Sequence, residues 1–112
     1  MKPLSKNSLE NFLKRFEYFK DGEFRDIIIN SPTNITLNFA IQDASRGYDW
    51  ITLKLEFDGI SDASLLDSSN LAHIDMSEGV YLKNDGTEFA FKVNNSTFKI
   101  KSSSLKYEEG QF

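Results

Sequence analysis

The chain has 112 residues, a formal net charge of −4 and no cysteine, and ten Phe, four Tyr and one Trp supply its aromatic side chains. This length favours a single domain over residues 1–112, and the lack of cysteine excludes disulfides, thiolate zinc sites and cysteine nucleophiles. No stretch approaches the roughly 18 apolar residues of a membrane span, and the N-terminal residues lack the apolar run of a signal peptide. We therefore expect a cytoplasmic protein without a membrane partner.

Residues 5–20 are predicted to form one amphipathic helix, with Ser5 as its N-cap and Gly22 as a left-handed residue just beyond its end. The apolar residues of this stretch recur at helical spacing and form a single stripe, made up of Leu9, Phe12, Leu13, Phe16 and Phe19. A helix with one apolar stripe buries one face. We expect this helix to cover one face of a sheet.

After Gly22 the apolar residues recur at every second position, which predicts short strands with one buried and one exposed face. The expected strands are 24–30, 34–42, 50–57, 71–76, 80–83, 87–93 and 97–101, with a last apolar pair at 105 and 107. The Asp- and Ser-rich stretch 58–70 is predicted to be a connection, and residues 108–112 a frayed tail.

The serines at 102–104 mark a change in which positions are apolar. Phe98 and Ile100 are even-numbered, whereas Leu105 and Tyr107 are odd-numbered. One extra residue in a strand shifts the following side chains to the other face. We therefore expect a bulge or a loop at these serines.

The pattern as a whole predicts an α+β fold. No connection is long enough to hold a crossover helix, so about six to seven strands between residues 24 and 107 should form a mainly antiparallel meander sheet. One short helix cannot cover so many flat strands, so the sheet should curve around it. Two interpretations stay open for one set of aromatic residues, a close-packed core or a pocket for a small apolar ligand: Phe12, Phe16, Phe39, Phe57, Phe89 and Phe91.

The residue types that carry chemistry are sparse. His73 is the single histidine, so it has no nitrogen or sulfur partners for zinc, and Asp75 is its nearest candidate partner for acid–base work. Asp58 and Asp62 are better explained as turn residues than as a catalytic pair. The sequence also lacks the glycine-rich phosphate-binding and nucleophile motifs. We expect no enzymatic activity, no metal and no cofactor.

The charge is concentrated in the middle of the chain. Residues 43–88 hold ten acidic and three basic residues, a net charge of −7. This balance argues against nucleic acid as a partner, because phosphate contacts need clustered Lys and Arg. The acidic residues either keep the protein soluble or attract a basic partner protein.

Trp50 is the most informative residue, because it breaks the alternation of its strand. Ile51 and Leu53 begin the apolar face of 50–57, so Trp50 falls on the polar face. Exposed Trp and Tyr often anchor protein interfaces, although Trp50 could instead fold over the sheet edge and pack on the loop at 43–47 or on the chain termini. With the nearby acids they make a candidate partner-binding set: Trp50, Tyr48, Tyr81, Asp43, Asp49, Asp58 and Asp62.

The stretch 34–67 carries a family resemblance through Trp50 at the start of its second strand, the run Phe57-x-Gly59-Ile60, and the Asp- and Ser-rich connection that follows. This pattern resembles immunity proteins of bacterial toxin systems and related uncharacterised families. The resemblance implies a bacterial, non-enzymatic protein-binding domain that caps a basic partner such as a toxin. The alternatives are a small-ligand binding domain and a homo-oligomer, such as a dimer, that associates through the Trp50 face.

Overall fold

The computed structural model describes residues 1–20, 22–65 and 74–112, and in these residues a short helical segment packs on a seven-stranded antiparallel sheet. The N-terminal elements are β1 (Lys2–Pro3), the 3₁₀ turn η1 (Lys6–Ser8), α1 (Leu9–Arg15) and the 3₁₀ turn η2 (Glu17–Phe19). They are followed by β2 (Glu23–Ser31), β3 (Asn34–Asp43), the 3₁₀ turn η3 (Ala44–Arg46), β4 (Asp49–Ser64), β5 (Val80–Asn84), β6 (Phe89–Val93) and β7 (Lys99–Gln111). The predicted α+β class is confirmed. Within the described part of the chain, no helix is long and apolar enough to cross a membrane.

The predicted apolar stripe is buried, but the helix that carries it is shorter than the sequence indicates. All five residues of the stripe are at most 6% exposed, whereas the α-helix itself spans only Leu9–Arg15. The Phe12 ring packs 5.0 Å from the Tyr107 ring of β7, which fixes the helix against the inner face of the sheet. The helix therefore covers the sheet as expected, although with two turns rather than four.

A left-handed turn ends the helical segment. Glu17, Tyr18 and Phe19 have φ angles of 52°, 58° and 65°, a conformation that costs L-residues roughly 1–2 kcal/mol each. The turn points the fully buried Phe19 ring at Phe39 on β3, with 5.1 Å between the ring centroids. Burial of this ring, worth about 1.5–3 kcal/mol, offsets part of the strain. The prediction of a left-handed Gly22 is wrong, because the chain reverses before Gly22, which does not have a positive φ.

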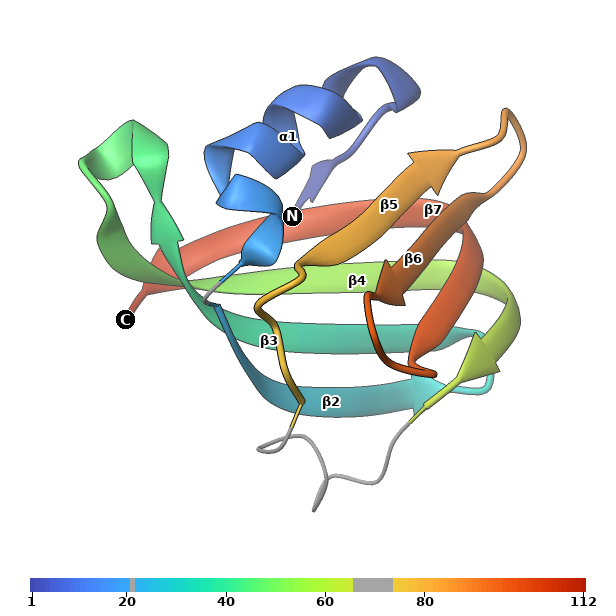
Figure 1. The fold of residues 1–112 in the computed structure, drawn as a ribbon. Helices are drawn as coiled ribbons and strands as arrows, with labels where there is room; N and C mark the ends of the chain where they lie inside the picture. Colours follow the sequence, from blue (N-terminus) through green and yellow to red (C-terminus); the bar gives the residue numbers. More distant parts are fainter. Residues whose placement is uncertain (21, 66–73) are drawn as a thin grey trace.

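The sheet consists of two three-stranded meanders joined along β4 and β7 (Figure 1). β2, β3 and β4 form one meander and β5, β6 and β7 form the other. β7 pairs antiparallel with β4, so the strand order is β2-β3-β4-β7-β6-β5. The predicted antiparallel pairing is confirmed, and the strand order, which the sequence left open, places β7 between β4 and β6.

β4 and β7 are longer than predicted, because they pair with each other along most of their length. β4 continues through residues 58–64, which the sequence assigns to a connection, and β7 continues through 108–111, which the sequence assigns to a frayed tail. Gly59 allows this with a φ of 66°, and a side chain there would collide with Ser103 on β7. Both sequence assignments are wrong, since pairing outweighs the low strand propensity of Asp, Gly and Ser.

The buried positions change parity at the serines, as predicted: Ile100 and Ser102 are buried before the change and Leu105 after it. The predicted bulge or loop at these serines is wrong, because β7 continues through them without an extra residue. Ile60 and Asp62 of β4 pair with the adjacent residues Ser102 and Lys101, so the bulge lies in β4 instead.

The prediction of a strand at 71–76 is wrong for residues 74–76, the part of it that the structure describes. Residues 74–76 have no regular structure, while 71–73, including His73, lie outside the described residues. A turn at 77–79 leads into β5, and Gly79 takes a φ of 72° there. Regular pairing therefore resumes at Val80.

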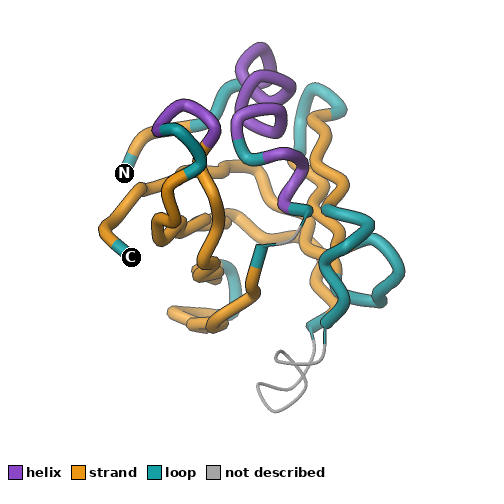
Figure 2. The backbone as a smooth tube through the Cα atoms, turned by 60° about the vertical axis from the view of Figure 1, so that its left-hand side comes forward, coloured by secondary structure: helices purple, strands orange, loops and turns teal. Residues whose placement is uncertain are grey.

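The core lies between the helical segment and the concave face of the sheet, as Figure 2 shows with the helices above the curved strands. Its aromatic rings pack at centroid distances between 4.6 and 6.5 Å, many of them edge to face. All six phenylalanines that were candidates for a ligand pocket are at most 6% exposed. This packing favours a core over a pocket for a small apolar ligand.

Candidate functional site

Trp50 lies on the outer face of the sheet, as its position in the alternation predicts. It is the second residue of β4, opposite Gln42 of β3, and 39% of its surface is exposed. Its indole packs beside the ring of Phe112, the last residue of the chain, with 5.8 Å between the centroids. This contact agrees with the predicted alternative in which Trp50 packs on a chain terminus.

Phe112 is a member of this surface that the sequence did not reveal. It follows the last residue of β7, and pairing of Gln111 with Ile51 on β4 brings it level with Trp50. Phe112 is 68% exposed, and the guanidinium carbon of Arg25 on β2 lies 5.7 Å from its ring centroid. Residues 108–111 are polar or glycine, so no apolar alternation in the sequence signalled this extension.

Tyr48 projects its ring from the turn that precedes β4. Its φ is 65°, which is unusual for a tyrosine, and its ring is 51% exposed. Two hydrogen bonds hold this backbone: the Tyr48 amide donates to the carbonyl of Asp43 at 2.9 Å, and the Gln42 side chain donates to the carbonyl of Tyr48 at 3.2 Å. We refer to Tyr48, Trp50 and Phe112 as the aromatic patch.

Asp43 differs from the other predicted site residues because its side chain is completely buried. Arg15 of α1 donates to both carboxylate oxygens of Asp43, at 2.9 and 2.6 Å, and its third nitrogen donates to Glu109 of β7 at 2.8 Å. Arg46 contacts the same two carboxylates, at 3.4 and 2.8 Å. Asp43 therefore ties the helix to the sheet and offers no surface to a partner.

The electrostatics of this four-residue network follow from its geometry. The hydrogen bonds from Arg15 lower the pKa of Asp43 to about 2, although burial alone would raise it. Arg15 likewise lowers the pKa of Glu109, and the two carboxylates raise the pKa of Arg15. With two cations and two anions, this network carries no net charge of its own.

The three remaining acids are spread along β4. Asp49 is exposed beside Trp50 and makes no ion pair within the described residues. Asp58 accepts a 3.3 Å hydrogen bond from Asn34, and Asp62 lies 3.9 Å from Lys99. Asp62 is twelve residues beyond Trp50, about 40 Å of strand at roughly 3.3 Å per residue. The predicted ring of carboxylates around Trp50 is thus reduced to Asp49.

Tyr81 lies at the far edge of the sheet from Trp50. It is on β5, which is separated from β4 by β6 and β7. The Lys83 ammonium lies 5.3 Å from the Tyr81 ring centroid, and the ring is 43% exposed. Tyr81 belongs to a different surface from the aromatic patch.

Comparisons with known proteins add no relative: no family model, no curated protein and no solved structure matches the chain. The described residues also contain no group of three or more His, Asp or Glu side chains arranged to hold a metal ion. The interpretation of the site therefore depends on its own geometry.

Proposed function

We propose that the chain is a non-enzymatic, cytoplasmic protein-binding domain whose partner docks on the aromatic patch. The observation that carries this proposal is the pair of exposed rings of Trp50 on β4 and Phe112 just beyond β7, whose centroids are 5.8 Å apart. The exposed Tyr48 lies two residues before Trp50 in the chain. Tyr and Trp dominate the energetics of protein interfaces, and truncation of such anchors often costs 2 kcal/mol or more.

The charges around the patch favour a basic partner. Arg25 and Arg46 are each already paired with a carboxylate, Glu23 at 2.9 Å and Glu109 at 2.8 Å. Asp49 is the nearby charge that no ion pair in the described chain compensates. A Lys or Arg of the partner would meet this carboxylate and the faces of the aromatic rings together. An inhibitor that caps a basic toxin, as the family resemblance suggests, is the specific form we propose.

Capture from a lysate of the source organism tests the proposal, with wild type, Trp50→Ala and Tyr81→Ala as baits. Tyr81→Ala is a matched control, since it removes a similarly exposed aromatic ring from the edge strand β5, which β7 and β6 separate from β4. We expect a basic protein that is retained by wild type and Tyr81→Ala, lost with Trp50→Ala, and weakened by salt.

Purified partner then gives the affinity. We expect Trp50→Ala to weaken binding roughly 30-fold or more, which corresponds to about 2 kcal/mol. Equal binding by Trp50→Ala and wild type, or equal loss with Tyr81→Ala, would contradict docking on the aromatic patch. Light scattering of the bait alone identifies a self-associated chain, which is the competing use of the same surface.

A further inference from the structure

Four lysines gather on the outer face of β5, β6 and the first part of β7. Lys83, Lys92, Lys99 and Lys101 are all exposed, and they come from three neighbouring strands of a chain whose net charge is negative. Their spacing along the sequence hides this cluster, which forms only when the strands pair. Together with Tyr81 and Ala90 we call this surface the lysine face.

The strand register arranges the lysine face as two rows. Tyr81, Lys92 and Lys99 lie opposite one another in the first row, and Lys83, Ala90 and Lys101 in the second. Adjacent strands are about 4.8 Å apart, and the rows are about 6.6 Å apart, two residues along each strand. The small Ala90 is therefore surrounded by the long side chains.

The fold itself does not account for this arrangement. Lys92 and Lys99 are directly opposite each other, and like charges at such positions destabilise a sheet. Lysines often protect an exposed sheet edge, but only Lys83 lies on the edge strand β5. Among the described residues, the one ion pair that these lysines make is the 3.9 Å contact of Lys99 with Asp62. Asp62 also pairs with Lys101 across β4 and β7, so it offsets one of the four charges, and the positive charge is confined to the rows of the lysine face.

An apolar hollow lies at the centre of the lysine face. It has a volume of about 160 Å³ and is lined by Tyr81, Ala90, Phe91, Lys92, Lys99, Ile100 and Lys101. Its polar rim and apolar floor suit a ligand that carries one apolar side chain between anionic groups.

We propose that the lysine face binds an acidic segment of a protein, in which carboxylates flank one apolar side chain that enters the hollow over Ala90. An extended segment repeats its side chains about every 6.6 Å on one face, which matches the spacing of the two lysine rows. The lysines supply charge complementarity, and the hollow supplies an apolar anchor.

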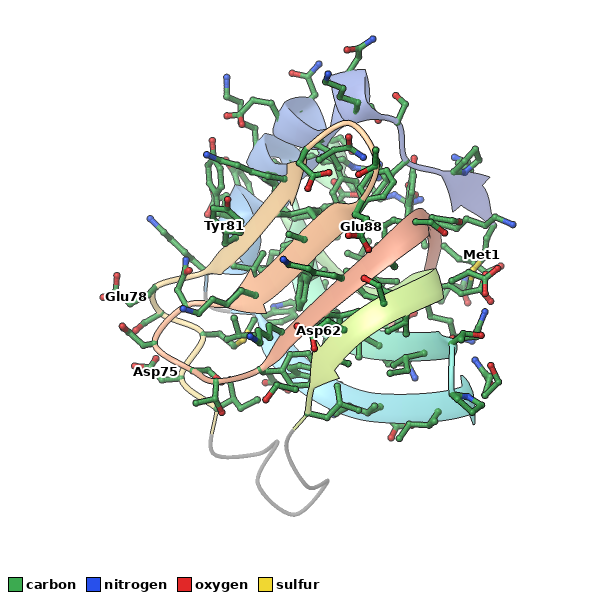
Figure 3. The ribbon with its side chains drawn as sticks, turned by 90° about the vertical axis from the view of Figure 1, so that its right-hand side faces the viewer. Met1, Asp62, Asp75, Glu78, Tyr81 and Glu88 are labelled. Atoms are coloured by element: carbon green, nitrogen blue, oxygen red, sulfur yellow. The ribbon has the colours of Figure 1, made fainter. Side chains whose placement is uncertain are left out.

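Carboxylates at the rim favour a protein segment over nucleic acid. Figure 3 shows Asp62, Asp75, Glu78 and Glu88 placed around the surface on which Tyr81 lies. These acids repel the uniform negative charge of a nucleic-acid strand, whereas a protein can place basic residues opposite them. The lysine face is separate from the aromatic patch and opposite in charge, so either proposal can fail without the other.

Fluorescence polarisation with a labelled peptide tests this proposal on the full chain. The probe has glutamates at alternate positions around a central leucine, and the comparison ligands are the same peptide with glutamines and a single-stranded oligonucleotide of equal charge. We expect the acidic peptide to bind more tightly than both and to bind more weakly at high salt. Binding of the oligonucleotide with equal or higher affinity would overturn the proposal, as would equal binding of the glutamine peptide.

Matched variants test whether the peptide binds on the lysine face. We expect the Lys92→Gln/Lys99→Gln double variant to weaken binding roughly fivefold, while Lys54→Gln/Lys106→Gln, an equal charge change on exposed residues elsewhere, has little effect. Ala90→Leu fills the hollow without a change in charge and should weaken binding by a similar factor. The idea fails if both double variants act alike or if Ala90→Leu, shown by circular dichroism to be folded, binds as wild type does. Trp50→Ala should bind the peptide normally.

Discussion

Asp43 continues the inward-facing apolar positions of β3, so its carboxylate points toward the core rather than toward solvent. A buried carboxylate requires partners, and Arg15 and Arg46 provide them. The sequence contains a signal for this pairing, because Asp43 has the parity of Phe39 and Ile41, and Arg15 follows Phe12 by one helical turn. Reading Asp43 as a surface acid overlooked that parity.

The Asp43→Asn variant should lower the free energy of unfolding by roughly 2–3 kcal/mol, because it leaves a partly buried Arg15 without its main counter-charge. Urea denaturation measures this loss. Glu23→Gln is the control, since Glu23 forms an exposed pair with Arg25 and its loss should cost less than about 1 kcal/mol. Similar losses in the two variants would show that the network adds no more than a surface ion pair.

The same network makes a prediction about pH. The pKa of Asp43 is about 2 in the folded chain against an ordinary value of 3.8, so its contribution is fully present above pH 4 and is lost as the pH falls toward 2. This amounts to roughly 2 kcal/mol, and the lowered pKa of Glu109 acts in the same direction. Urea denaturation at several pH values measures it. Asp43→Asn should lose less stability than wild type between pH 4 and pH 2, and parallel pH profiles would contradict this role for Asp43.

A substitution of Tyr48 should affect partner binding but not the stability of the fold. Its left-handed backbone costs a tyrosine roughly 1 kcal/mol or more, a penalty that glycine avoids. Tyr48→Gly should therefore leave the melting temperature unchanged or slightly higher while it weakens partner binding. A variant that melts much lower would show that the ring is needed for folding. A variant that binds the captured partner normally would remove Tyr48 from the aromatic patch.

At the scale of elements, the left-handed turn η2 depends on a glycine in a neighbouring turn. A side chain at Gly79 would collide with the carbonyl oxygen of Tyr18, whereas a side chain at Gly47 would meet no atom within 4 Å. Both glycines have a positive φ, 72° and 62°. The two positions therefore differ in contact rather than in backbone conformation.

Gly79→Ala should thus destabilise the fold more than Gly47→Ala does. The φ penalty alone is about 1 kcal/mol at each site, and the collision with Tyr18 should add at least about 1 kcal/mol at Gly79. Urea denaturation of the two variants makes the comparison. Equal losses would mean that η2 can move away from Gly79 without cost.

The local spacing of apolar residues predicted which elements form better than it predicted where they end. The helical stripe and the alternation of residues 51–57 and of β6 are local properties, and the structure confirms them, whereas in β3 Thr36 and Ala40 of the other face are buried as well. The ends of β4 and β7 are set by their mutual pairing, which links Asp58 to Ser104 and Lys54 to Glu108 across about 50 residues of sequence. Local propensity carries no information on such pairs, so the loop and the tail were misassigned.

At the scale of the whole molecule, the strand order decides which side chains can share a surface. Trp50 and Tyr81 both occupy outward-facing positions but lie on strands separated by two others, and Asp62 lies beside Lys99 rather than beside Trp50. Phe112 reaches the aromatic patch only through the β4–β7 pairing. Sequence reasoning therefore found the centre of the aromatic patch but not its extent, and it missed the lysine face.

The joined meanders give the molecule two separate surfaces of different character. The aromatic patch lies where β4 begins and β7 ends, and the lysine face covers β5, β6 and the start of β7. One surface is apolar with an uncompensated carboxylate and the other is basic around an apolar hollow. The two proposals together assign a basic partner to one surface and an acidic segment to the other.

The most direct test is the fluorescence of Trp50, the only tryptophan of the chain, during titration with a captured partner that lacks tryptophan or has its own signal subtracted. Docking on the aromatic patch would move the 39% exposed indole out of water. We expect the emission to shift to shorter wavelength and acrylamide quenching to fall as the complex forms. A partner that binds stoichiometrically and leaves both signals unchanged would show that the aromatic patch is not the binding surface.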